Sequence, residues 1–138
     1  MKTKIMSIII NVVFGLAMIV GLGCASNRIN LVDNGTVTVE RINSRGAYVS
    51  SVYVYQDGDY LVISGRVKQL YSTVVTDRGH VDITMLNPDG TTLKQVSKRY
   101  NPRLSRKKRT AYFRARLPVI LTPGVIVRVM HHSGSNLC

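Results

Sequence analysis

The chain contains no tryptophan and only two phenylalanines among its 138 residues. Seven tyrosines therefore supply most of the aromatic surface that can pack or contact a ligand. Hydrophobic residues still make up 45% of the sequence, which is enough for a hydrophobic core. This content excludes a chain that is disordered throughout. The length predicts a single compact domain, because a second domain would not fit.

Cysteine is also scarce, with only Cys24 and Cys138 present. Two cysteines exclude the internal disulfide framework that stabilises many small secreted domains. If Cys24 carries a lipid, Cys138 is an odd thiol, either inert in a terminal tail or available for an intermolecular disulfide. If Cys24 is unmodified, a disulfide between the two ends of the chain is an alternative.

Acidic residues are absent from the C-terminal third of the chain. From Gly90 to Cys138 there are eleven lysines and arginines and no aspartate or glutamate, whereas Cys24 to Asp89 carries six basic and seven acidic residues. The net charge of +12 is therefore concentrated in one part of the sequence. This asymmetry predicts an anionic partner or surface.

Motifs of catalysis are missing as well. The sequence has no Gly-x-Ser-x-Gly elbow and no glycine-rich phosphate loop, and its seven acids are spread over separate strands and turns. We therefore expect no enzymatic activity and no cofactor.

Histidine occurs only at His80, His131 and His132. Adjacent strand residues point to opposite faces, so His131 and His132 are poorly placed to share a metal ion, and we expect no metal site. His80 and Asp82 lie two residues apart, which places them on one face of a strand and is compatible with a hydrogen bond.

The first 24 residues have the pattern of an export signal. Lys2 and Lys4 precede the apolar segment Ile5–Val20, and small residues follow up to Cys24. The segment resembles a bacterial lipoprotein signal, although Gly21 stands where leucine is usual. The resemblance implies that a signal helix within residues 1–23 is removed and that Cys24 is acylated. Ordinary cleavage of a soluble exported protein and an uncleaved membrane anchor are the alternatives.

The residue after the cysteine, Ala25, implies through the same resemblance an outer-membrane lipoprotein whose domain faces the periplasm. Residues 24–35 are polar and predict a tether between membrane and domain.

Residues 36–132 alternate polar and apolar side chains in short runs rich in β-branched and aromatic residues, and residues 133–138 form a C-terminal tail. Turn residues separate these runs, most clearly in Asn87–Gly90 and Gln56–Asp59. The pattern predicts an all-β domain, a seven-stranded antiparallel β-sandwich, with a small closed barrel as the alternative. The predicted strands are Thr36–Ile42, Tyr48–Tyr55, Tyr60–Gln69, His80–Leu86, Thr91–Tyr100, Thr110–Leu117 and Val125–His132.

Several of these strands together resemble small bacterial lipoproteins that carry an immunoglobulin-like or transthyretin-like sandwich. The resemblance lies in Val62–Val67, Gly79–Ile83 with the turn Asn87–Gly90, Phe113–Pro118 and Val125–His132. It implies fold and envelope location and no particular activity.

The segment Lys98–Arg109 has seven positive residues in twelve, and the expected outward positions of the next strand add two arginines. Tyr100 and Tyr112 flank the segment and are candidates for stacking or membrane-interface contacts. The alternative interpretation is a solvated loop that only prevents aggregation at a strand edge. The candidate residues for binding an anionic partner are Arg99, Arg103, Arg106, Lys107, Lys108, Arg109, Arg114 and Arg116.

These observations predict a membrane-anchored envelope lipoprotein that acts as a structural or assembly component through its basic surface. The expected partner is an acidic protein, or anionic lipid or lipopolysaccharide; nucleic acid is disfavoured because an exported chain meets little of it. The alternative is a periplasmic protein that binds a metal or small ligand through His80, His131 and His132.

Overall fold

The computed structural model describes residues 28–70 and 79–134. These residues form seven strands and no helix, and each strand begins and ends within two residues of its predicted limits. The predicted signal segment, Cys24 and Cys138 lie outside the described residues. No helix in the described ranges is long and apolar enough to cross a membrane. The strands are β1 (Val37–Ile42), β2 (Ala47–Asp57), β3 (Tyr60–Gln69), β4 (His80–Leu86), β5 (Thr92–Arg99), β6 (Thr110–Leu117) and β7 (Val125–His132).

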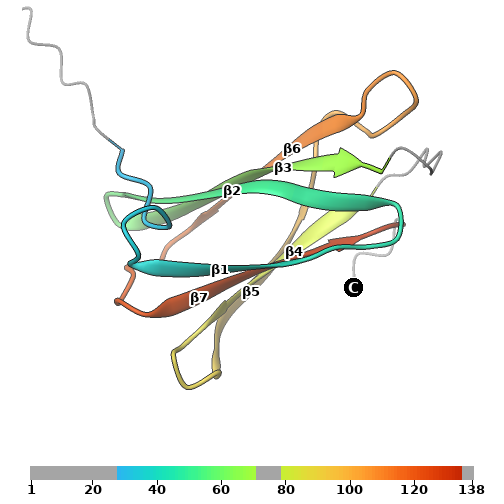
Figure 1. Ribbon diagram of the computed structural model, residues 1–138. Coiled ribbons are helices and arrows are strands. Elements are labelled where there is room, and N and C mark those ends of the chain that lie inside the picture. Colours follow the sequence, from blue (N-terminus) through green and yellow to red (C-terminus); the bar gives the residue numbers. More distant parts are fainter. Residues whose placement is uncertain (1–27, 71–78, 135–138) are drawn as a thin grey trace, which may run out of the picture.

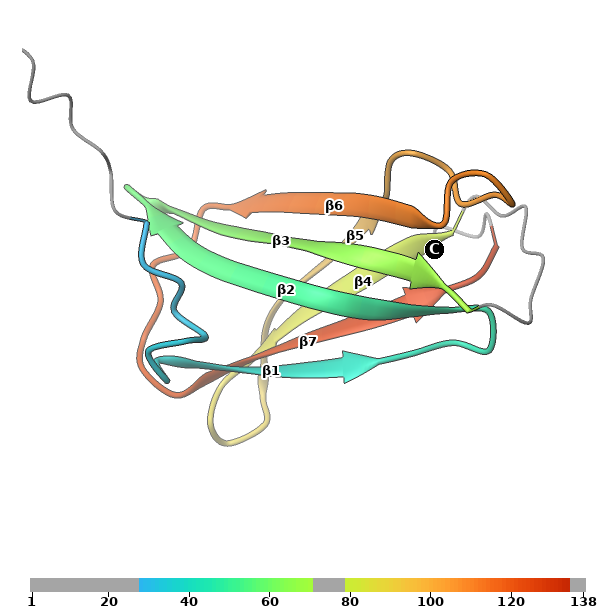
Figure 2. The same ribbon diagram turned by 45° about the horizontal axis from the view of Figure 1, so that its top comes forward.

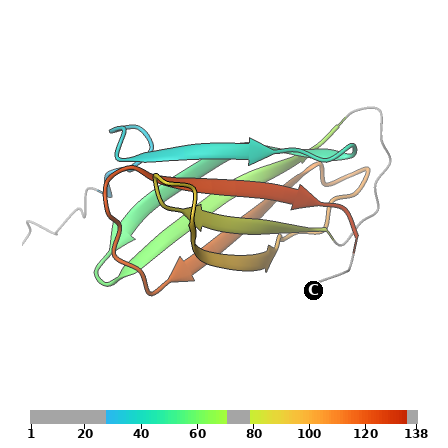
Figure 3. The ribbon, with the colours of Figure 1, turned by 90° about the horizontal axis from the view of Figure 1, so that it is seen from below.

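The strands form two sheets that lie one above the other (Figures 1 and 2). One sheet has the order β1-β7-β4-β5 and the other the order β2-β3-β6. Figure 3 views the four-stranded sheet with the three-stranded sheet behind it. The inward residues of both sheets form one hydrophobic cluster, for example Val81 and Ile83 of β4 with Phe113 and Ala115 of β6. The all-β prediction is therefore confirmed as two layers around a shared core.

The expectation of purely antiparallel pairing is wrong for one pair of strands. β1 pairs with β7 in parallel, with Val37 opposite Val125 and Ile42 opposite Met130. Both strands start at the same end of the molecule, where the amide of Gly124 donates to the carbonyl of Thr36 at 3.1 Å. Alternation within a strand sets its buried face but not the direction of its neighbour, so the sequence pattern does not contain this feature.

The grouping of strands also differs from that of immunoglobulin constant domains. In those domains the first, second, fourth and fifth strands share one sheet. Here β2, β3 and β6 share one sheet, while β1, β4, β5 and β7 share the other. The shared feature is the two-layered all-β architecture.

A β-bulge in β2 keeps its apolar residues on the core side. Val49 and Val52 are three residues apart, so a regular strand would point them to opposite faces. The register shift between Val49 and Ser51 inserts one extra residue, and both valines are buried. Beyond the bulge, the outward positions of β2 become Tyr53 and Tyr55.

The two predicted hairpin turns are confirmed. Gly58 and Gly90 adopt positive φ angles of 60° and 85°, which favour glycine. In the β4–β5 turn the amide of Gly90 donates to the carbonyl of Asn87 at 2.9 Å. These turns fix the register of β2 with β3 and of β4 with β5.

The described part of the expected tether lies against the domain. Leu31 and Val32 pack on the core, and the amide of Leu31 donates to the carbonyl of Val54 at 2.8 Å. The side chain of Asn30 accepts hydrogen bonds from the amides of Val32 and Val54. The domain therefore includes Asn30, Leu31 and Val32, which lie before its predicted start at residue 36, and residues 24–27 of the expected tether lie outside the described part.

Candidate binding face of the β2-β3-β6 sheet

Arg114 and Arg116 lie on the outward face of β6. They are exposed, and they alternate with Phe113 and Ala115, which are buried in the core. This confirms the faces predicted from the alternation. The two arginine side chains therefore project from the outer surface of the three-stranded sheet, away from the hydrophobic core.

The connection between β5 and β6 presents most of the other predicted cations. Its centre is anchored, because Leu104 is fully buried and Asn101 forms two backbone hydrogen bonds of 2.8 Å with Tyr112. A turn closed by the amide of Ser105, which donates to the carbonyl of Lys108 at 2.9 Å, holds the tip. We call residues 100–109 the basic loop; its exposed cations are Arg103, Arg106, Lys107, Lys108 and Arg109.

Two residues of the predicted basic segment lie elsewhere. Arg99 ends β5 in the other sheet, opposite His80, so it does not join the cations of the β2-β3-β6 face. Tyr100 is 7% exposed and its hydroxyl lies 3.3 Å from Nε2 of His131, which makes it a core residue and not a stacking platform. Tyr112, in contrast, is 56% exposed on the outward face of β6.

Tyrosines of β2 and β3 share this outward face, and sequence reasoning missed them. Tyr53 and Tyr60 are exposed at 43% and 40%, while Tyr48 and Tyr55 are half-buried. The registers interleave them with cations, since Tyr53 aligns with Arg114 across Ser64, and Tyr55 aligns with Arg116 across Val62. The tyrosine–arginine face is defined as Tyr48, Tyr53, Tyr55, Tyr60, Arg66, Lys68, Tyr112, Arg114 and Arg116.

Contacts between rings and guanidinium groups hold several of these side chains against the sheet. The guanidinium carbon of Arg116 lies 4.1 Å from the centroid of the Tyr60 ring, and that of Arg28 lies 5.1 Å from the Tyr55 ring. Nη2 of Arg114 donates to the hydroxyl of Tyr55 at 3.1 Å. Such contacts are worth about 0.5–1 kcal/mol each at exposed sites, and they order the arginines before any ligand arrives.

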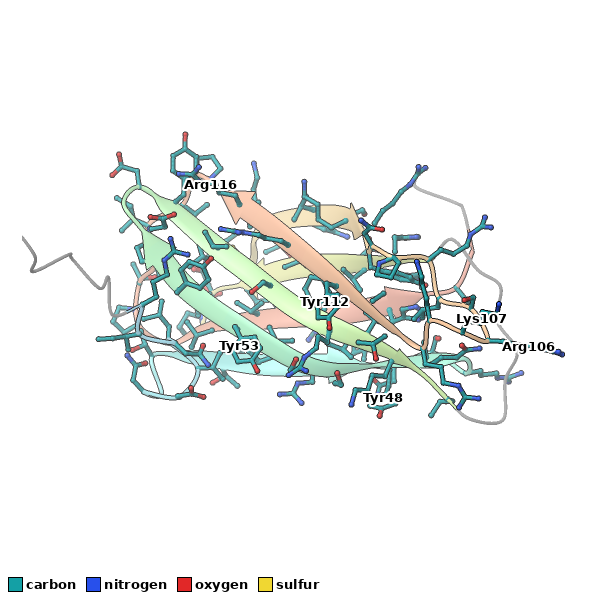
Figure 4. All side chains as sticks on the ribbon, turned by 90° about the horizontal axis from the view of Figure 1, so that it is seen from above. Tyr48, Tyr53, Arg106, Lys107, Tyr112 and Arg116 are labelled. Carbon is teal, nitrogen blue, oxygen red and sulfur yellow. The ribbon has the colours of Figure 1, made fainter. Side chains whose placement is uncertain are left out.

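A shallow depression of about 380 Å³ lies in the middle of the face. The small outward side chain of Ser64 lies in this depression, between the larger side chains of Tyr53 on β2 and Arg114 on β6. Tyr53, Arg66, Tyr112 and Arg114 are among its lining residues. Figure 4 shows Tyr53 and Tyr112 on this face, with Arg116 toward one end and Arg106 and Lys107 in the loop at the other.

A second, smaller pocket of about 150 Å³ lies where the face meets the basic loop. Lys68 and Arg109 contribute cations to it, and Tyr48, Gln69 and Thr110 complete the lining. A cationic surface therefore continues from the sheet into the loop.

Acidic residues are nearly absent from this surface. Within β2, β3, β6 and the turn that joins β2 to β3, the only acids are Asp57 and Asp59 at that turn. The remaining surface combines cations, aromatic rings and hydroxyl groups. Such a surface is suited to phosphate or carboxylate groups, to which arginine can offer two parallel hydrogen bonds.

The three histidines divide between two faces of the other sheet. His131 is buried, and its Nδ1 lies 2.7 Å from the hydroxyl of Ser44. His80 and His132 lie opposite each other on the outward face, where their rings stack at 5.1 Å, beside Asp82. The set His80, His131 and His132 expected for a metal or small ligand is therefore not brought together, because His131 points into the core.

Comparison with known proteins gives no match: no family model, no curated protein and no solved structure is significantly similar to the chain.

Proposed function

We propose that the chain is a membrane-anchored lipoprotein of the bacterial envelope whose tyrosine–arginine face binds the phosphate groups of anionic lipids. The observation that carries the proposal is that cations and tyrosines gather on one outward sheet face. The acidic residues of that face are confined to the β2–β3 turn. No catalytic step is part of this function. The domain acts by docking.

The start of the described chain supports a membrane as the partner. Arg28 contacts Tyr55 through its guanidinium group, so the chain enters the domain at one end of the tyrosine–arginine face. Cys24 is four residues earlier in the sequence. Four extended residues span at most about 14 Å, so an acylated Cys24 would keep this end of the face close to the bilayer.

The chemistry of the face also suits a lipid headgroup layer. Each lysine or arginine near an anionic membrane surface contributes about 1 kcal/mol, and the attraction decays within the Debye length. Tyrosine is enriched at membrane interfaces because its ring is apolar and its hydroxyl is polar. Arginines already ordered by contacts with Tyr55 and Tyr60 lose less conformational entropy on binding.

Charge reversal on the face tests this proposal. The full chain, held in zwitterionic detergent micelles, is titrated with phosphatidylglycerol, and the apparent affinity is followed from amide chemical shifts. Arg114→Glu with Arg116→Glu should weaken binding by about tenfold or more at low salt, because two attractive charges become repulsive. Lys94→Glu with Lys98→Glu makes the same charge change on β5 of the other sheet and should have a much smaller effect.

Equal losses in both double variants would mean that net charge alone drives association, which contradicts the proposed face. An unresponsive wild-type chain would also overturn the proposal. If poly-glutamate shifted the same amides while phosphatidylglycerol did not, an acidic protein partner would replace the lipid.

The anchor is tested separately by intact-mass analysis of the membrane fraction from a Gram-negative host. The wild-type chain should gain the mass of acyl chains, and Cys24→Ser should abolish this gain. An unmodified soluble species would remove the lipoprotein part of the proposal while leaving the face to be tested by the titration.

A further inference from the structure

A group of potential metal ligands lies on the outward face of the β1-β7-β4-β5 sheet. His80 of β4 is opposite His132 of β7, and Asp82 follows His80 at the next outward position. One potential ligand atom from each of the three residues lies within 4.8 Å of the others. No other comparable group of histidine, cysteine or acidic residues occurs among residues 28–70 and 79–134.

Both imidazole rings direct Nε2 toward the same carboxylate. Nε2 of His132 lies 3.0 Å from Oδ2 of Asp82, and Nε2 of His80 lies 3.6 Å from Oδ1. The two rings stack with an interplanar angle of 14°. This convergence brings two nitrogens and a carboxylate together at one point.

The buried ring of His80 lacks a hydrogen bond within the described part of the chain. The residue is 6% exposed, its Nδ1 has no partner, and the 3.6 Å from its Nε2 to Asp82 is too long for a hydrogen bond. Burying a polar nitrogen without a partner costs free energy. A cation placed between Nε2 of His80 and Asp82 would give Nε2 a partner, while Nδ1 would still have none within the described residues.

The carboxylate is itself oriented by a neighbour. The hydroxyl of Ser97, opposite Asp82 on β5, donates a hydrogen bond to Oδ1. Hydrogen bonds from outside the ligand set are typical of metal sites, where they fix the ligand and tune its affinity. Ser97 thus holds Asp82 in an orientation that leaves Oδ2 toward His132.

Only small movements are needed for coordination. Zinc bonds of about 2.1 Å in a tetrahedral arrangement place ligand atoms about 3.4 Å apart. The side chain of His132 is 40% exposed and that of Asp82 is 21% exposed, so both have room to adjust, and solvent can supply a fourth ligand. Arg99 lies opposite His80 on β5 but is exposed, where water and salt screen its charge.

We propose that Nε2 of His80, Nε2 of His132 and a carboxylate oxygen of Asp82 form a site for a divalent transition-metal ion. Two imidazoles and one carboxylate suit Zn²⁺, with Cu²⁺ as a competitor expected from its generally higher affinity for such ligands. The site lies on the sheet opposite the tyrosine–arginine face and does not depend on lipid binding.

Calorimetry with Zn²⁺ on the full chain in zwitterionic micelles tests the site, with Cys24→Ser and Cys138→Ser in every sample so that no thiolate competes. One Zn²⁺ should bind per chain. Asp82→Asn and His132→Gln should each lower the affinity about 100-fold or more, and Ser97→Ala about tenfold, because ligands contribute more than the groups that orient them. Asp59→Asn makes the same chemical change in the β2–β3 turn and should leave the affinity unchanged.

The ring protons of His80 and His132 should shift on Zn²⁺ addition while those of His131 stay in place. His132→Gln keeps the test valid if Asp82→Asn perturbs the fold, because His132 is half exposed. Failure of the chain that carries only the two cysteine substitutions to bind Zn²⁺, or an unchanged affinity when His132→Gln is added to it, would overturn the site.

Discussion

Nη2 of Arg114 donates a hydrogen bond of 3.1 Å to the hydroxyl of Tyr55, although β6 and β2 do not pair with each other. The contact spans β3, the strand between them. Val62 of β3 is completely buried even though its side chain is on the outward side of the sheet. Polar and aromatic side chains therefore cover the central strand and give the outward side of this sheet a polar, cationic surface.

Tyr55→Phe should release Arg114 from this arrangement while keeping the ring. We expect the affinity for phosphatidylglycerol to fall a few-fold, because Arg114 would have to be ordered on binding. Stability should change by less than about 1 kcal/mol, as the lost hydrogen bond is exposed. Tyr60→Phe is the matched control, since the ring under Arg116 remains. A similar loss of affinity in both variants would contradict the role assigned to the Tyr55 hydroxyl.

Gly65→Ala should destabilise the domain. A β-carbon at this position would collide with the carbonyl oxygen of Ser51 and with the ring of Phe113. Overpacking of this kind costs about 1–3 kcal/mol. Urea denaturation would measure the loss in the free energy of unfolding; a variant as stable as wild type would show that the bulge and the Phe113 ring adjust freely.

The fold was largely predictable because each strand carries its own signal. Alternation in β6 and β7 and the turn Asn87–Gly90 are local patterns, and they located strands and buried faces correctly. The parallel pairing of β1 with β7 was not predictable, because it depends on which ends of the molecule the connections reach. The bulge in β2 was also missed. Its extra residue can be recognised only once the structure shows that Val49 and Val52 are both buried.

The candidate face was predictable in part. The outward positions of Arg114 and Arg116 follow from alternation. Arg99 was assigned to the wrong face because the basic segment of the sequence begins in β5 of one sheet and continues through the loop to β6 of the other. The tyrosines at positions 53 and 55 alternate with buried valines, a signal present in the sequence. Their meeting with the arginines of β6 required the pairing order β2-β3-β6.

Leu104→Ala should show that the basic loop is part of the domain's structure. Leu104 is fully buried, and removing a buried leucine side chain costs about 2–5 kcal/mol. Arg106→Ala, two residues away and exposed, should be nearly neutral. Thermal unfolding of both variants makes the comparison, and equal melting temperatures would mean that the loop does not depend on Leu104.

The β4–β5 turn predicts a defined pH dependence. Hydrogen bonds from the hydroxyl and the amide of Thr91, at 2.6 and 2.9 Å, lower the pKa of Asp89 from its ordinary value of 3.8. A lowered pKa stabilises the fold above pH 3.8, and this contribution is lost as the pH falls through the lower folded-state pKa. Carboxyl NMR titration should show this, and Thr91→Val should move the pKa part of the way back. An Asp89 pKa at or above 3.8 in the wild-type chain would contradict the assignment.

The most direct test of the proposed function is paramagnetic relaxation from a lipid with a spin-labelled headgroup, measured on the full chain in nanodiscs that contain phosphatidylglycerol. If the tyrosine–arginine face docks on the membrane, amides of β2, β3, β6 and the basic loop should broaden most, and those of β7 and β4 should broaden least. Removing phosphatidylglycerol should abolish the difference. Equal broadening of both sheets, or stronger broadening of β7 and β4, would show that the tyrosine–arginine face does not dock on the membrane.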